Sequence, residues 1–119
     1  MNITSFYPAL LTKNSDAVVE KMKKLGFEVI HETKDLIQNV DHEYTMQDKN
    51  GNRFDVVHTS VFDDKYAIRI NVDNIEEAVK IHKEFGFKAI VDVEINASSK
   101  RALLESPEGQ ITYLIEHKK

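Results

Sequence analysis

The sequence predicts an α+β fold built from two copies of one βαβββ unit, and an internal repeat is the main reason for this prediction. Residues 14–30 align with residues 74–90 at a constant shift of 60 positions, and both segments space their apolar residues as a helix does. A turn signal follows each segment, Asn50-Gly51 in the first half and Ser106-Pro107-Glu108-Gly109 in the second. Strand-like sequence flanks each predicted helix. Each half therefore has the order strand, helix, and three further strands.

The two predicted helices have matching start and stop signals. Asn14 and Asn74 are expected to cap them through their side-chain oxygens. Gly26 and Gly86 are expected to end them, because a left-handed backbone conformation costs glycine little. The apolar positions that predict the buried helix faces are Val18, Val19, Met22 and Leu25 in the first half, and Ala78, Val79, Ile81 and Phe85 in the second.

Strands complete the two units. They are predicted at Ile3–Thr12, Phe27–Thr33, Tyr44–Gln47 and Phe54–Thr59 in the first half, and at Tyr66–Val72, Lys88–Ile95, Ala102–Glu105 and Ile111–Glu116 in the second. The linker Phe62–Lys65 is too short to let the halves separate. We therefore predict one domain over residues 1–119, built from modules 1–61 and 62–119.

The composition excludes several classes of protein. A net charge of −4 with scattered basic residues gives no electrostatic footprint for nucleic acid. The absence of cysteine excludes disulfides and thiolate catalysis and favours a reducing compartment. The sequence shows neither a signal-peptide pattern nor an apolar run near the roughly 20 residues that a membrane span needs. We expect a cytoplasmic protein that binds neither nucleic acid nor membrane.

The repeat, the helix end Leu25-Gly26-Phe27 and the two hairpin turns together resemble the vicinal oxygen chelate superfamily over essentially the whole chain. That superfamily includes glyoxalase I, extradiol dioxygenases, and fosfomycin- and bleomycin-resistance proteins. The resemblance implies two tandem βαβββ modules that form a curved mixed sheet around a concave pocket, often in a homodimer. We expect a homodimer here, because sheet edges are commonly covered by a partner and two-fold dimers are the commonest assembly.

Metal-using members of the superfamily place up to four ligands on the first and last strands of each module. The resemblance implies that these positions are Tyr7 and Ala67 on the first strands, and Asp55 and Tyr113 on the last strands. A divalent transition metal requires imidazole, carboxylate or thiolate in three or more places. One carboxylate, two phenols and a methyl group do not meet this requirement, so we expect neither a metal nor another cofactor.

Arg69 is a further pocket candidate. Its strand alternates in polarity, and the apolar residues expected to pack beneath the second helix are Tyr66, Ile68, Ile70 and Val72. Ala67 and Arg69 then point to the opposite face. Arg69 could clamp a carboxylate or phosphate of a ligand, or it could neutralise Asp55. We favour pairing of Asp55 with Arg69 or Arg53.

Three functional hypotheses follow from the sequence. The favoured one is a metal-free protein that holds a small organic molecule in the concave sheet, with Tyr7 and Tyr113 lining the pocket. The second is a lyase- or isomerase-like enzyme of the glyoxalase type with a non-standard site, in which Asp55, Arg69 and Tyr113 supply acid–base and orienting groups. The third is a degenerate, non-catalytic dimeric protein whose pocket is filled by these aromatic rings.

Overall fold

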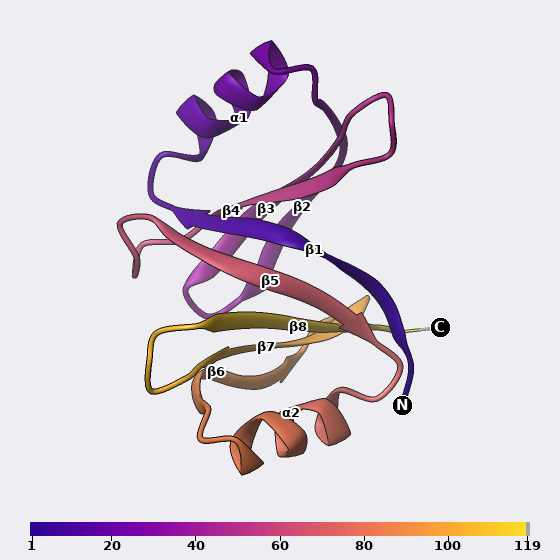
Figure 1. Cartoon of the computed structure of the whole chain (residues 1–119), viewed down its shortest axis with the longest axis vertical. Coiled ribbons are helices and arrows are strands. Elements are labelled where there is room, and N and C mark those ends of the chain that lie inside the picture. The colour runs from indigo at the N-terminus through magenta and orange to yellow at the C-terminus, as the bar shows by residue number, and fades with distance from the viewer. Residues whose placement is uncertain (119) are drawn as a thin grey trace. The chain divides into compact units, whose positions relative to one another are not determined.

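A computed structural model describes residues 1–118, with the side chains of Asp35 and Leu36 excepted. Over these residues the chain forms the element order β-α-β-β-β twice, which confirms the predicted α+β fold class (Figure 1). The chain divides into two compact units. The first, here called the N-terminal unit, spans Tyr7–Tyr66, and the C-terminal unit combines Met1–Phe6 with the residues from Ala67 onward.

The N-terminal unit contains one helix and four strands of the described chain. They are β1 (Ile3–Thr12, from Tyr7 onward), α1 (Ser15–Lys24), β2 (Glu28–Ile37), β3 (Val40–Gln47) and β4 (Arg53–His58). The strands lie in the order β2-β3-β4-β1. Strand β1 is parallel to β4, and the other neighbouring pairs are antiparallel, so the sheet is mixed as predicted.

The C-terminal unit repeats this arrangement. Its elements are β5 (Lys65–Val72), α2 (Ile75–Glu84), β6 (Lys88–Ile95), β7 (Ser99–Glu105) and β8 (Ile111–His117). The strands lie in the order β5-β8-β7-β6, with β5 parallel to β8. The start of the chain joins this unit through Asn2, whose carbonyl accepts a hydrogen bond from the Asp73 N–H and whose own N–H donates to the Asp73 carboxylate.

Both helices end as the sequence predicts. Gly26 and Gly86 adopt positive φ angles of 110° and 89°. The N–H groups of Phe27 and Phe87 then reach back to the carbonyls of Met22 and His82, as in a Schellman motif. This turn carries the chain away from the helix axis. The residues at the C-cap positions, predicted to be buried, are instead exposed: Leu25 at 68% and Phe85 at 77%.

Only one of the two predicted asparagine caps forms. The Asn74 side chain accepts a hydrogen bond from the Glu77 N–H at 3.1 Å, as expected. The Asn14 side chain makes no capping bond, so this prediction is wrong. The Asn14 backbone, at φ −116° and ψ 50°, is not extended, and its N–H is bound instead by the hydroxyl of Thr12 at 3.0 Å.

This difference predicts unequal effects of two matched substitutions. Asn74→Ala should lower the free energy of unfolding by about 1 kcal/mol, because it removes the acceptor of a helix N-terminal N–H. Asn14→Ala, the control, should cost clearly less. Urea denaturation of both variants measures the difference, and equal losses would contradict the assignment of the caps.

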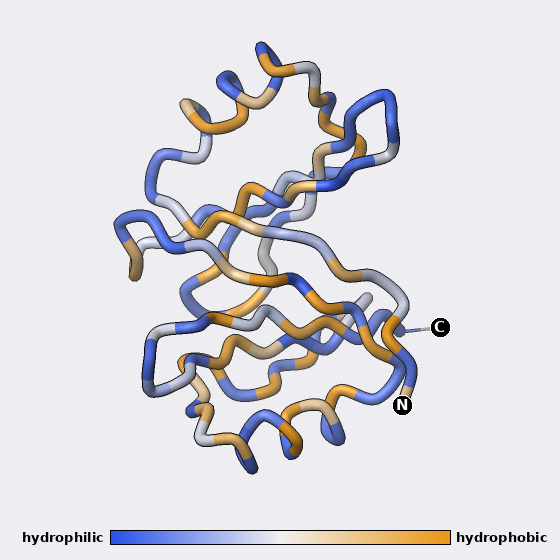
Figure 2. Tube along the Cα trace, in the orientation of Figure 1, coloured by the Kyte–Doolittle hydropathy of each residue, from blue (hydrophilic) through white to orange (hydrophobic). Residues whose placement is uncertain are grey.

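Each unit has its own apolar core on the helix side of its sheet. In the N-terminal unit, Val19 of α1 packs with Leu10, Met46, Phe54 and Val56. In the C-terminal unit, the corresponding core consists of Val72, Ile75, Ala78, Ala102, Leu104 and Leu114. Figure 2 shows hydrophobic stretches along the strands and a hydrophilic β3–β4 loop. Two predicted core residues of β5 lie outside: Tyr66 is 67% and Ile68 36% exposed, while Ile70 and Val72 pack as predicted.

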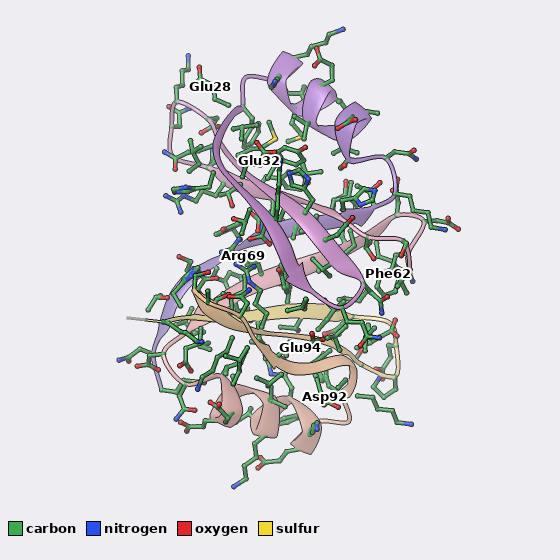
Figure 3. The ribbon with its side chains drawn as sticks, turned by 180° about the vertical axis from the view of Figure 1, so that it is seen from behind. Glu28, Glu32, Phe62, Arg69, Asp92 and Glu94 are labelled. Atoms are coloured by element: carbon green, nitrogen blue, oxygen red, sulfur yellow. The ribbon has the colours of Figure 1, made fainter. Side chains whose placement is uncertain are left out.

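The outer strands β2 and β6 are irregular at equivalent places. The pairing register shifts between Val29 and His31 in β2 and between Ala89 and Val91 in β6, again 60 positions apart. Acidic side chains also mark these strands, Glu28 and Glu32 on β2, and Asp92 and Glu94 on β6 (Figure 3). Bulges and charges are the usual protection of a strand edge against pairing with another chain. The homodimer remains a prediction, and strand-edge pairing is an unfavourable way to form it.

Candidate functional site

The sheet face that points away from α2 carries the buried arginines of the C-terminal unit. Even-numbered residues of β7 and β8 pack in the core beneath the helix, so the odd-numbered residues point to the other face. This face includes two arginines, Arg69 and Arg101, which are only 5% and 2% exposed. Buried guanidinium groups require hydrogen-bond and charge partners.

Arg101 is held by two neighbours on this face. Its Nε–H donates to the Ser99 hydroxyl at 2.9 Å, and its Nη1–H donates to the Tyr113 hydroxyl at 2.6 Å. The guanidinium carbon also lies 5.7 Å from the centroid of the Tyr113 ring. Tyr113 and Ser99 are fully buried. The arginine is therefore fixed in one orientation. Recognition of a planar anion by a guanidinium requires such a fixed orientation.

Arg69 lies directly beside Tyr113 in the parallel pairing of β5 with β8. Its Nε–H donates to the Asn71 side-chain oxygen at 3.0 Å. Ala67, two residues earlier on the same face, is also buried. The C-terminal unit thus brings three of the five predicted site residues onto one sheet face, and Figure 3 shows Arg69 on its strand.

The other two predicted residues lie on the corresponding face of the N-terminal unit. Tyr7 is on β1 and Asp55 on β4, and both are buried. Asp55 pairs with Ala9 of β1 and with Thr45 of β3. Arg53, one of its two predicted ion-pair partners, is exposed and donates its Nε–H to Gln47. Asp55 and Arg69 belong to different units, so their pairing remains a prediction.

Two charged residues of these faces were not predicted from the sequence, Glu43 and Arg101. Glu43 is 2% exposed and lies on β3 on the same face as Asp55. It is separated from Arg101 by 58 positions, the spacing that also separates Asp55 from Tyr113. The repeat therefore places a carboxylate in one unit where it places a guanidinium in the other. Extending the repeat through the later strands would have found both residues.

The four positions that the family pattern assigns to metal ligands do not fit a metal ion. Tyr7, Asp55, Ala67 and Tyr113 offer one carboxylate and no imidazole, and a transition metal requires at least three good ligands. Among the residues that the structure describes, no group of three or more His, Asp or Glu side chains is placed to hold a metal ion.

We therefore expect metal-independent behaviour in solution. The purified protein should carry well under one equivalent of zinc, nickel, manganese or iron, and EDTA should leave its melting temperature unchanged. Elemental analysis after dialysis and a thermal melt with and without chelator measure this. Stoichiometric metal that survives dialysis would contradict the expectation.

Three of the histidines lie in ordinary structural settings. His42 Nε2 lies 2.8 Å from the Glu32 carboxylate, and His58 Nδ1 lies 2.7 Å from that of Asp41. The hydrogen bond with His58 holds the pKa of Asp41 below its usual value. His82 bonds to the carbonyl of Ala78 within its own helix.

Clefts in the C-terminal unit lie away from the polar face. One, of about 300 Å³, lies between the start of β6 and the β7–β8 turn, with Lys88, Glu105 and Pro107 in its lining. Another, of about 60 Å³, is lined mainly by apolar residues around Met1, Ile70 and Ile81. No helix in the described part of the chain is long and apolar enough to cross a membrane.

Comparisons with known proteins identify the fold. No family model matches the sequence, and no curated protein matches it. Among solved structures, methylmalonyl-CoA epimerase from Mycobacterium tuberculosis aligns with a TM-score of 0.70 at 11% identity, covering 98% of this chain and 90% of that chain. A variant of methylmalonyl-CoA epimerase from Streptomyces coelicolor, in complex with 2-nitronate-propionyl-CoA, aligns at 0.69 and 15% identity, covering 99% and 100%.

A third structure extends the likeness beyond the epimerases. It is a glyoxalase/bleomycin resistance protein/dioxygenase superfamily member from Vibrio splendidus 12B01, with a TM-score of 0.61 and 15% identity, covering 97% of this chain and 99% of that chain. Identities this low show a shared fold and not a shared activity. This chain has the vicinal oxygen chelate fold that the sequence predicted.

Proposed function

We propose that this chain is a metal-independent binding protein of the vicinal oxygen chelate type, which holds a small molecule with an anionic group against the sheet face that carries Arg101. The observation that carries the proposal is the fixed orientation of the Arg101 guanidinium by Ser99 and Tyr113. An oriented guanidinium suits bidentate recognition of a carboxylate or phosphate. The structural neighbours support a ligand-binding role, since one of them is a complex with a coenzyme A derivative.

A binding measurement tests this proposal with a defined probe. Methylmalonyl-CoA is suitable because it is anionic and because several neighbours are named as its epimerases. We expect calorimetry to detect saturable binding that is unchanged by EDTA, and we expect no epimerisation. Arg101→Lys keeps the charge but loses the planar fork, so it should weaken binding at least tenfold.

Arg53→Lys provides the matched control. Arg53 is exposed and bonds to Gln47, so this change should leave binding unaltered. Equal binding by both variants would contradict the role of Arg101. Epimerisation that requires added metal would contradict the proposed metal independence.

The second candidate is the degenerate protein of the third hypothesis, whose pocket is filled and which binds no ligand. One observation favours it. Both arginines of the C-terminal unit and two buried acids of the N-terminal unit, Glu43 and Asp55, are at most 5% exposed. If these charges neutralise one another within the protein, no ligand is needed to balance them. Absence of probe binding, together with strong stability coupling between acid and arginine, would favour this candidate.

A further inference from the structure

The β3–β4 hairpin loop contains a dipeptide that is chemically unlike the rest of the chain. Asn50 is followed by Gly51, whereas each of the other asparagines precedes a residue with a side chain. Both residues are exposed, and Gly51 has a φ of 84°, which favours glycine at this position. A glycine leaves its amide nitrogen unhindered by a neighbouring side chain.

We propose that Asn50 is a site of spontaneous deamidation in the folded protein. The Gly51 nitrogen loses its proton and attacks Cγ of Asn50, and a new N–Cγ bond closes a five-membered succinimide ring. The bond from Cγ to Nδ2 breaks, and the amide leaves as ammonia. Solvent water then opens the ring at either carbonyl, giving aspartate or isoaspartate. The sum of the steps converts asparagine and water into a carboxylic acid and ammonia, without any oxidant or cofactor.

The hydrogen bonds of the loop control this reaction. The Gly51 N–H donates to the backbone carbonyl of Asp48 at 3.2 Å, so the attacking nitrogen must first leave this partner. The Asp48 carboxylate holds the loop, since Oδ1 accepts the N–H groups of Asn50 and Asn52 at 2.9 Å each and Oδ2 accepts the Asn52 side-chain amide at 2.8 Å. The bond from the Asn52 side chain is the main cause that lowers the pKa of Asp48. Asp48 therefore slows the reaction.

The product would alter the hairpin that positions Asp55. A carboxylate at position 50 adds negative charge close to Asp48, and an isoaspartyl residue adds one carbon to the main chain. Gln47 and Arg53 pair directly on either side of the loop, and Thr45 pairs with Asp55 further along the same two strands. The longer main chain of the loop therefore strains the pairing of β3 with β4 close to Asp55.

Peptide mass spectrometry of the full chain tests the proposal. The native protein is incubated at mildly alkaline pH and 37 °C, digested, and compared with a sample kept cold. We expect the amide-to-acid mass change at position 50, with both aspartate and isoaspartate products, and no comparable change at the other asparagines. Asn50→Ser should abolish it, and Asp48→Ala should accelerate it severalfold.

Two outcomes would overturn the proposal. One is an unchanged Asn50 in the native protein under conditions in which the same chain, unfolded in denaturant, is converted at this position. The other is equal conversion at several asparagines, which would show that the hairpin confers no selectivity. A deamidation rate that Asp48→Ala leaves unchanged would contradict the role of Asp48 in slowing the reaction. Circular dichroism of both variants confirms that they are folded before the rates are compared.

Discussion

Replacement of Tyr113 by Phe should lower the free energy of unfolding by about 1–3 kcal/mol, the usual cost of removing one partner of a buried hydrogen bond. The ring and its packing remain, but the hydroxyl that accepts the Arg101 Nη1–H is lost. The penalty arises because a buried cationic donor then lacks this acceptor, and it should approach the upper end of the range. Urea denaturation monitored by circular dichroism measures the change.

The same substitution at Tyr66 is the matched control. Tyr66 is 67% exposed, and removal of an exposed hydroxyl should change stability by no more than about 0.5 kcal/mol. Equal effects of the two changes would show that the Arg101–Tyr113 bond contributes nothing specific. In the binding assay, Tyr113→Phe should also weaken capture of methylmalonyl-CoA, because the arginine loses a group that orients it.

The sequence predicts the fold well because local signals and the repeat agree. Helix-ending glycines, hairpin turns and apolar alternation each indicate the same βαβββ order, and all are local in sequence. The predicted ranges of β1 and β6 match those of the structure. The cap at Asn14 was wrong because helix capping depends on backbone angles and on competition from Thr12, which residue type alone does not specify.

The candidate site was predicted less completely, and the reason lies at two strand boundaries. The strands containing Glu43 and Arg101 were predicted to begin at Tyr44 and Ala102, but they begin at Val40 and Ser99. Both charged residues therefore lay just outside the predicted strand ranges. Charged residues near a strand end resemble loop sequence, and burial is set by tertiary packing, which a single sequence does not show.

Arg69→Met tests whether Arg69 neutralises Asp55 or binds a ligand. Both residues are buried, at 5% and 0% exposure, and the methionine keeps much of the apolar stem of the arginine. If Arg69 neutralises Asp55, as we expect, the single change leaves a buried carboxylate without its counter-charge. Breaking such a pair should cost on the order of 3 kcal/mol. If Arg69 instead binds an anionic ligand, stability should change little and binding should be lost.

The double-mutant cycle with Asp55→Asn separates these alternatives, because asparagine removes the charge while keeping the shape of Asp55. Under the pairing hypothesis, much of the stability lost in Arg69→Met should return in the double variant. A coupling energy below about 0.5 kcal/mol, the usual limit for independent sites, would contradict the pairing. Strong coupling would mean that the positive charge of Arg69 is already neutralised within the protein.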